Sequence, residues 1–245
     1  MAQTVRIAAI AVATVDGMVE ANYQRAIRLG EISLQDQPDI ILFPEAFAAG
    51  YVGTDLTPYG EDLDQSPYLQ EFRRLSEQGD CLVVVGYLEA AGAGVKNAVA
   101  LYDRGALLGT HYKSSMWSDD ERPYRDERAL LVCGEGIEVF ATRLGRFAVL
   151  ICYENTLEAN WREVAPQVDF VLSPYNCQGD PSHYNLDQAK RFGLPSAWAD
   201  RTGTVYAGDK FKPNPGTAGL CDAQGNIIAI SPPGVEQIVV GELPF

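Results

Sequence analysis

Three side chains with the chemistry of a nucleophile, a base and a cation each follow a run of apolar residues. Cys152 comes after the run at residues 147–151, Glu45 after the run at residues 40–44, and Lys113 after a shorter one. A thiol can attack an electrophilic carbon when a carboxylate takes its proton, and an ammonium group can stabilise the negative charge that develops. These residues are therefore candidates for nucleophilic catalysis. The alternative is that Cys152 is a buried core thiol, which is the usual environment of cysteine.

The apolar runs predict buried β-strands, with the three polar side chains at their ends. Proline cannot donate a hydrogen bond to a sheet, so Pro44 ends its strand and places Glu45 at the tip. In open α/β architectures, loops that leave buried strands bring their side chains into one crevice. We therefore expect Glu45, Lys113 and Cys152 at strand ends around such a crevice.

Strand and helix patterns alternate along the chain, which predicts an α/β fold. A strand at residues 5–12, an amphipathic helix at residues 23–34 and the strand before Glu45 form a parallel crossover unit. Further expected elements are helices at residues 66–78, 157–164 and 186–200, strands at 81–87, 96–102, 168–172 and 204–206, and closing hairpins at 216–241. We interpret residues 1–245 as a single domain, because the chain is long and apolar enough for one packed core.

Four short motifs follow one another along the chain. They are Phe43-Pro44-Glu45, Tyr112-Lys113, Cys152-Tyr153-Glu154-Asn155 and the segment at residues 216–225. In this order they resemble the motifs of the nitrilase superfamily of carbon-nitrogen hydrolases. The resemblance implies a four-layer α-β-β-α sandwich in which Glu45, Lys113 and Cys152 are the catalytic set. It also implies a homodimer or a larger homo-oligomer.

Members of that superfamily carry a second glutamate about seven residues before a glycine, between the lysine and the cysteine. Glu127 stands in this relation to Gly134, so the resemblance assigns to Glu127 the role of holding Lys113, with Glu121 as the reserve. The surrounding segment, residues 114–134, is rich in charge, and most of its charged residues are expected to be solvated.

Aromatic and amide side chains near the three strand ends are candidate substrate contacts. A long loop at residues 46–64 follows Glu45 and is a candidate pocket wall. The candidate contacts are Phe47, Tyr51, Trp117, Tyr124, Tyr153, Tyr175 and Asn176. The backbone N–H of Tyr153 is also a candidate oxyanion donor. The helix at residues 157–164 is expected to favour the thiolate of Cys152 through its dipole.

Charge and composition limit the classes of partner and cofactor. A formal net charge of −14 and a pI near 4.5 argue against nucleic acid or an anionic membrane, because both require clustered Lys and Arg. No run approaches the roughly 20 apolar residues of a membrane span, and the run at residues 7–12 fits a first strand better than a signal peptide. We expect no cofactor and no metal, since the only histidines, His111 and His183, lack ligand spacing.

The cysteines are odd in number and widely spaced, which favours reduced thiols in a cytoplasmic protein. They are Cys81, Cys133, Cys152, Cys177 and Cys221.

The resemblance leaves the substrate open among small amides, N-carbamoyl compounds and nitriles. Cys152-Tyr153-Glu154-Asn155 is closer to the Cys-Trp-Glu-Asn of true nitrilases than to many amidases. The chain ends at Phe245 without the long C-terminal extension of those nitrilases, which favours the amidase expectation. A non-catalytic protein that binds a small ligand is the alternative from a different class. The sequence does not identify the substrate, because the loops around Cys152 cannot be placed from pattern.

Overall fold

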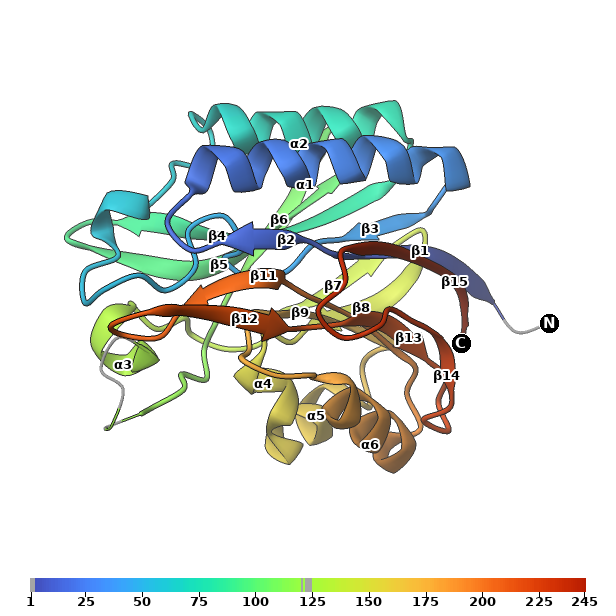
Figure 1. Ribbon diagram of the computed structural model, residues 1–245. Coiled ribbons are helices and arrows are strands. Elements are labelled where there is room, and N and C mark those ends of the chain that lie inside the picture. Colours follow the sequence, from blue (N-terminus) through green and yellow to red (C-terminus); the bar gives the residue numbers. More distant parts are fainter. Residues whose placement is uncertain (1–2, 120, 122–124) are drawn as a thin grey trace.

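The computed structural model describes residues 3–119, 121 and 125–245. Two six-stranded sheets and a smaller three-stranded sheet make up the β-structure of these residues. Helices cover the outer face of each large sheet, α1 and α2 on one side of the molecule and α4, α5 and α6 on the other (Figure 1). The architecture is therefore the four-layer α-β-β-α sandwich expected from the motifs.

The first sheet has the strand order β15-β1-β3-β4-β5-β6. Its strands are β1 (Thr4–Ala11), β3 (Ile40–Leu42), β4 (Leu82–Ala91), β5 (Gly94–Asp103), β6 (Ala106–Tyr112) and β15 (Gln237–Pro244). The strands β1, β3 and β4 are parallel, as the crossover pattern predicts. Because β5 is antiparallel to both β4 and β6, the strands β3 and β6 run in the same direction and end at the same edge of the sheet.

The second sheet repeats this plan with the order β14-β13-β10-β9-β8-β7. Its strands are β7 (Val139–Thr142), β8 (Gly145–Val149), β9 (Phe170–Tyr175), β10 (Ser196–Asp200), β13 (Ala218–Cys221) and β14 (Ile227–Ile230). Here β8, β9 and β10 are the parallel strands. The small third sheet consists of β2 (Ala13–Val15), β11 (Thr202–Tyr206) and β12 (Phe211–Pro215).

The described residues form six helices, and all but α3 cover a large sheet. They are α1 (Val19–Ser33), α2 (Pro67–Gln78), α3 (Glu127–Leu130), α4 (Tyr153–Thr156), α5 (Glu158–Val164) and α6 (Ser182–Phe192), with short 3-10 turns η1 (Leu34–Asp36) and η2 (Thr57–Tyr59). The start of α2 is encoded locally: Pro67 is its first residue, and the Ser66 hydroxyl accepts the N–H of Leu69 at 3.3 Å.

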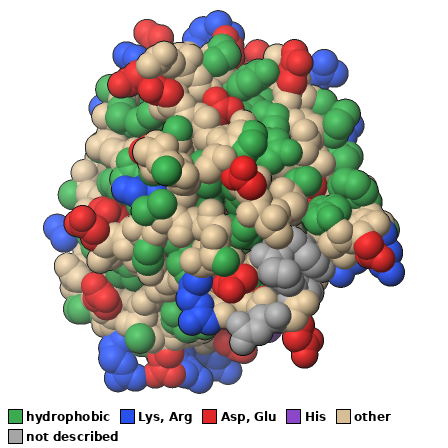
Figure 2. All heavy atoms as spheres, turned by 90° about the vertical axis from the view of Figure 1, so that its left-hand side faces the viewer, with side chains coloured by type: hydrophobic (Ala, Val, Ile, Leu, Met, Phe, Trp, Pro, Cys, Tyr) green, Lys and Arg blue, Asp and Glu red, His purple; other side chains and the backbone are tan. Residues whose placement is uncertain are grey.

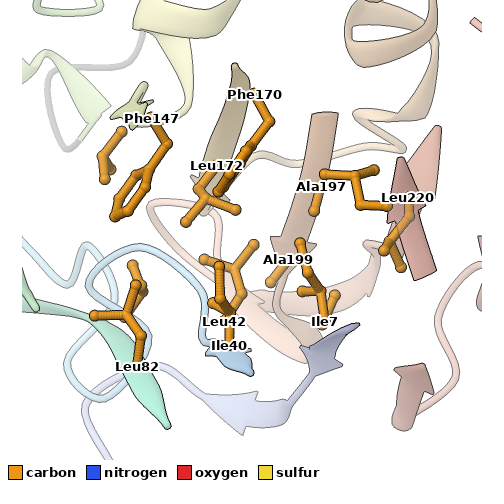
Figure 3. Packing of buried hydrophobic residues seen from close by; sticks show 14 of the residues in the cluster. Ile7, Ile40, Leu42, Leu82, Phe147, Phe170, Leu172, Ala197, Ala199 and Leu220 are labelled. Carbon is orange, nitrogen blue, oxygen red and sulfur yellow. The ribbon is translucent and has the colours of Figure 1, made fainter. Parts of the chain in front are cut away.

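Alternate residues of the central strands face two different layers. Ile40 and Leu42 of β3 point between the sheets, where they pack with Phe147, Phe170 and Leu172 of the second sheet (Figure 3). Ile41, between them in sequence, belongs instead to the cluster under α1 and α2. A strand that is buried on both faces has to be apolar at every position, which explains the uninterrupted apolar runs in the sequence.

The expected helix at residues 186–200 is wrong in both of its bounds. The structure has α6 at Ser182–Phe192 and the strand β10 at Ser196–Asp200. Gly193 adopts a left-handed conformation (φ 65°) that ends the helix, and Pro195 follows it. The residues after Pro195 are all buried between β9 and β13, so tertiary pairing decides their structure over the helix propensity of Ala197 and Ala199.

Figure 2 shows the molecule from the left-hand side of Figure 1. Hydrophobic and uncharged side chains occupy most of the middle of this face, and Lys and Arg side chains lie mainly toward its margin. In the described part of the chain, no helix has the length and apolar character needed to cross a membrane.

Candidate active site

Glu45, Lys113 and Cys152 each lie just beyond the end of a strand. Glu45 is three residues past β3, Lys113 directly follows β6, and Cys152 is three residues past β8. The two sheets meet at this rim, where the backbone N–H of Glu45 donates to the carbonyl of Tyr175 at 3.2 Å. Segments from both sheets therefore converge around the three side chains.

Gly86 of β4 allows the Glu45 segment to pass close to the sheet. A Cβ atom at this position would lie 2.3 Å from the carbonyl oxygen of Pro44 and 2.7 Å from the Cα atom of Glu45. No side chain fits at such distances. The glycine in an otherwise apolar strand is thus explained by the close approach of a second backbone.

Lys113 lies between two carboxylates. Its Nζ atom is 2.8 Å from Glu45 Oε1 and 2.6 Å from Glu127 Oε1, and all three side chains are buried. Glu127 is itself fixed, because its Oε2 accepts the backbone N–H of Trp117 at 2.7 Å. Glu121, the reserve choice for the second glutamate, is exposed. The structure therefore brings Glu127, and not Glu121, to the lysine.

Tyr51 and Asn97 donate further hydrogen bonds to this charged trio. The Tyr51 hydroxyl donates to Glu127 Oε1 at 2.7 Å, and the Asn97 amide donates to Glu45 Oε1 at 2.6 Å and to the Tyr51 oxygen at 3.0 Å. Asn97 is a β5 residue that no motif singled out. Its position is recognisable only from the cross-strand arrangement that places its carbonyl 2.9 Å from the N–H of Lys113.

The carboxylates keep Lys113 charged. Burial alone lowers the pKa of a lysine, but the charges of Glu127 and Glu45 outweigh it and raise the pKa of Lys113 above its ordinary value. The other oxygen of Glu45, Oε2, is buried and has no hydrogen-bond partner among the described residues. Buried carboxylate oxygens are rarely left unsatisfied, so Oε2 is available for a proton.

Cys152 occupies a strained turn between β8 and α4. Its φ is 50° and its ψ is −103°, a conformation that residues other than glycine rarely adopt and that is found preferentially at functional sites. Its N–H donates to the carbonyl of Pro174 at 2.8 Å. The turn is thus held by the C-terminal end of β9.

The thiol of Cys152 is protonated more readily than an ordinary cysteine. Burial and the nearby charge of Glu45 raise the pKa of Cys152 well above its ordinary value, although Lys113 acts in the opposite direction. The helix that begins next to the thiol is α4, a single turn, whereas the helix whose dipole was expected to favour the thiolate is α5, which begins six residues after Cys152. The effect of that dipole on the thiol stays a prediction.

Glu154 connects the lysine segment to the cysteine turn. Its Oε1 accepts the N–H of Ser114 at 2.7 Å, and its Oε2 accepts the N–H of Ile151 at 2.8 Å and lies 2.8 Å from His111 Nε2. His111 also contacts Glu138 through Nδ1. Burial lowers the pKa of His111, but its hydrogen bonds to Glu138 and Glu154 raise it to about 9.

A cavity of about 390 Å³ opens beside Cys152. Most of the described side chains proposed as catalytic or substrate-binding lie at this cavity. The exceptions are Phe47, which packs under α1 and α2, Glu121, which is exposed elsewhere, and Glu45, which contacts the cavity residue Lys113. The proposed residues that line the cavity are Tyr51, Lys113, Trp117, Glu127, Cys152, Tyr153, Tyr175 and Asn176. Tyr124, also proposed, lies outside the described residues.

Other residues of the cavity wall were not predicted from the sequence. These are Arg125, Thr156, Cys177, Gln178, Gly179, Asp180, His183 and Tyr184. Arg201 was not predicted either; it is fully buried, and its Nε donates to Asn176 Oδ1 at 2.7 Å. Most of these residues follow β9, where the sequence predicted only a wall of unknown shape. Across the described residues, no group of His, Cys, Asp and Glu side chains is arranged to hold a metal ion.

The structure combines an α-β-β-α sandwich with a strand-end cysteine and a buried Glu-Lys-Glu set. The family model of carbon-nitrogen hydrolases matches residues 6–245. The chain belongs to this family.

Solved structures of the nitrilase superfamily have the same fold. Nit3 of Saccharomyces cerevisiae aligns with a TM-score of 0.82 at 18% identity, over 99% of this chain and 90% of that chain. An amidase from Nesterenkonia sp. aligns with a TM-score of 0.82 at 18% identity, over 98% and 90% of the two chains. A variant of that amidase carries the acetamide moiety of fluoroacetamide on its active-site cysteine, and aligns with a TM-score of 0.82 at 19% identity over 98% and 90% of the two chains.

Curated relatives cover several activities. The glutamine-dependent NAD(+) synthetase of Acinetobacter baylyi is 27% identical over 68% of this chain and 31% of its own length. The bifunctional nitrilase/nitrile hydratase NIT4 of Oryza sativa is 26% identical over 64% of this chain and 48% of its own length. The protein N-terminal amidase of Saccharomyces cerevisiae is 22% identical over 68% and 38%. The matched part is thus less than half of each of these relatives.

Proposed function

We propose that the protein hydrolyses a non-peptide carbon-nitrogen bond in a small amide or N-carbamoyl compound through a thioester on Cys152. The observation that supports this most directly is the arrangement of Lys113 between Glu45 and Glu127, with the free oxygen of Glu45 buried at the same rim as the thiol. A structural ion pair needs only one carboxylate. A second carboxylate with an unsatisfied oxygen next to a cysteine suits proton transfer.

In this mechanism Glu45 Oε2 takes the proton of Cys152 as the sulfur attacks the carbonyl carbon. Burial and the charge of Glu45 raise the pKa of Cys152 and so disfavour a free thiolate before the attack. The carbon-nitrogen bond of the tetrahedral intermediate then breaks, Glu45 gives the proton to the leaving nitrogen, and a thioester remains. Water that loses a proton to Glu45 hydrolyses the thioester to the acid and returns the thiol.

Lys113 Nζ and the backbone N–H of Tyr153 stabilise the oxyanion of each tetrahedral intermediate. Loss of one such donor typically costs on the order of 3 kcal/mol of transition-state stabilisation. Glu127 is a positioning residue: it holds Lys113 and, through the N–H of Trp117, the adjacent wall of the cavity. The covalent adduct on the cysteine of the Nesterenkonia amidase is a precedent for the attack step.

Nitrile hydrolysis is the second enzymatic candidate, because the Cys152-Tyr153-Glu154-Asn155 motif and the match to NIT4 favour it over other chemistries. Both activities use the same thiol. They differ in the bond attacked, so a panel of small amides, N-carbamoyl compounds and nitriles, with released ammonia as the readout, separates them.

Cys152→Ala is the first test of the proposal. We expect this variant to fold, as judged by circular dichroism, and to release no ammonia from any compound that the wild-type protein hydrolyses. Cys133→Ala is the matched control, because Cys133 is exposed and lies outside the cavity. Wild-type turnover by Cys152→Ala would refute the assignment. Absence of turnover of every amide, N-carbamoyl compound and nitrile in the panel by the folded wild-type protein would favour the non-catalytic alternative.

A further inference from the structure

We propose that Arg201 is a positioning residue for substrate binding: it orients the side-chain amide of Asn176 so that the NH2 group of this amide donates a hydrogen bond to the substrate. This inference rests on the proposed hydrolase function. It comes from a fully buried arginine that does not line the cavity and takes no part in the proposed reaction.

Arg201 is the single residue between β10 and β11. Its Nε donates to Asn176 Oδ1 at 2.7 Å, and its Nη1 donates to the Thr14 hydroxyl at 2.9 Å. The guanidinium also forms a buried ion pair with Asp16. Thr14 belongs to β2, and Asp16 follows that strand. The arginine therefore links the small third sheet to the segment after β9, which forms part of the cavity wall.

Asp16 has contacts that hold it in place opposite the guanidinium. Its Oδ2 accepts the backbone N–H of Tyr206 at 2.6 Å. Its carboxylate also packs closely against Gly50, where a Cβ atom would lie 1.8 Å from Asp16 Oδ1. Gly50 precedes Tyr51, a residue of the cavity wall. The ion pair is therefore supported by the loop after Glu45 as well as by the small sheet.

The bond from Arg201 decides which way the amide of Asn176 faces. Every nitrogen of an arginine is a donor and none accepts, so the amide oxygen faces Arg201 and the NH2 group is turned away from it. Asn176 lines the cavity, and its Nδ2 atom is buried without an acceptor among the described residues. Buried donors are rarely left without a partner. A substrate in the cavity is therefore assigned as the acceptor.

This hydrogen bond acts on binding and not on the chemical step. In the proposed mechanism the protons move between Cys152, Glu45, water and the leaving nitrogen, and the amide of Asn176 exchanges none of them. An amide that is already held in the productive orientation costs less conformational entropy when the substrate binds. Loss of this orientation should therefore raise KM and leave kcat almost unchanged.

The alternative role of Arg201 is to stabilise the fold through its ion pair with Asp16. Arg201→Ala does not separate the two roles, because it leaves a buried carboxylate without its partner. Lysine keeps a positive charge opposite Asp16 but lacks the Nε–H donor that reaches Asn176. Arg201→Lys is therefore the informative variant, with folding checked by circular dichroism.

The kinetic test uses the compound that the wild-type protein hydrolyses fastest in the panel of small amides, N-carbamoyl compounds and nitriles. We expect Arg201→Lys and Asn176→Ala each to raise KM ~3- to 10-fold, the effect of one net hydrogen bond, with kcat within ~2-fold of wild type. Arg162→Lys is the matched control and should keep the wild-type KM, because Arg162 is an exposed arginine of α5 that also pairs with a carboxylate, Glu158.

The double variant Arg201→Lys/Asn176→Ala tests whether the arginine acts through the asparagine. Alanine has no amide to orient, so adding Arg201→Lys to Asn176→Ala should raise KM no further. An arginine with a purely structural role would give effects that multiply. Multiplying effects on KM, a wild-type KM in Arg201→Lys, or a loss of kcat at unchanged KM would overturn the proposal.

Alkylation of Cys152 by iodoacetamide, itself a small amide, gives a readout that needs no turnover. We expect both single variants to lower its second-order rate constant ~3- to 10-fold, measured by mass spectrometry of the Cys152 peptide, without a shift of its pH profile. Wild-type rates in both variants would overturn the positioning role. Normal turnover without an effect on KM would reject this role and leave the hydrolase proposal intact. Slower alkylation of the variants, without turnover of the panel by the wild-type protein, would support the role of Arg201 and reject the hydrolase proposal.

Discussion

At the scale of single residues, the notable point is that Cys152 sits beside a carboxylate that opposes its ionisation. A thiol of this kind does not react with every electrophile that enters the cavity. In the proposed mechanism it becomes a nucleophile only when a substrate is placed so that proton transfer to Glu45 and attack occur together. We therefore expect simple electrophiles to alkylate the sulfur slowly.

Glu45→Gln separates these two effects of the carboxylate. Removing the negative charge lowers the pKa of Cys152, so the pH profile of alkylation by iodoacetamide should move to lower pH. Removing the base should at the same time reduce kcat by ~10²- to 10⁴-fold. Glu135→Gln, at an exposed glutamate, is the control. A variant that alkylates at lower pH and also keeps wild-type turnover would show that Glu45 is not the base.

Single residues were predictable where they belong to a motif and end a strand. Glu45, Lys113 and Cys152 fall in this group, and Glu127 could be chosen by its distance from Gly134. Asn97 could not be found in this way, because it acts across neighbouring strands. Arg125 could not be found either, since one arginine in a charged loop has no pattern that distinguishes it from solvated neighbours.

At the scale of elements, the position of Glu45 depends on how closely its backbone can approach the neighbouring strand β4. Gly86 is the position at which β4 leaves room for the backbone of residues 44–45 to pass close to the strand. Apolar periodicity identified β4 as a buried strand, but the reason for its glycine appears only when the neighbouring segment is in place.

Gly86→Ala should move Glu45 away from Lys113. A Cβ atom would have to displace the backbone at Pro44 and Glu45, and a shift of about 1 Å in a catalytic group typically lowers the rate ~10²-fold. The overpacking should also cost ~1–3 kcal/mol of stability, measured by urea unfolding. Gly136→Ala is the control, because a Cβ there meets no atom within 4 Å. Wild-type activity in Gly86→Ala would mean that the site tolerates displacement of its base.

The sequence predicted most strands from their apolar runs, α1 from its amphipathic periodicity, and α2 from Ser66-Pro67 at its start and Gly79 at its end. It failed at residues 186–200, where small residues such as Ala197 and Ala199 fit either a helix or a crowded central strand. It also failed to indicate α4, which is a single turn held by the contacts of Glu154 and not by its own propensity.

At the scale of the whole molecule, His111 joins the outer strands of the two large sheets. It is a β6 residue of the first sheet, and its carboxylate partners, Glu154 and Glu138, belong to α4 and to the segment before β7 at the second sheet. The pairing lies next to the site, because Glu154 also holds the residue after Lys113.

His111 makes the stability of the molecule depend on pH. Its pKa in the folded protein is raised from 6.5 to about 9, so its stabilising effect is complete below about pH 6.5 and disappears as the pH rises through about 9. We expect the Tm of the wild-type protein to fall between these values by roughly 5 °C more than that of His111→Gln. His183→Gln, which removes an exposed histidine, should follow the wild-type curve. Parallel curves for wild-type protein and His111→Gln would contradict the assignment.

The hydrogen bond from the N–H of Glu45 to the carbonyl of Tyr175 has a consequence for the motions of the protein. It links the two sheets next to Glu45 and Cys152. A local separation of the sheets at this place would break it and would also move these two side chains apart. Exchange of this one amide proton with deuterium therefore reports how often the centre comes apart, independently of any substrate.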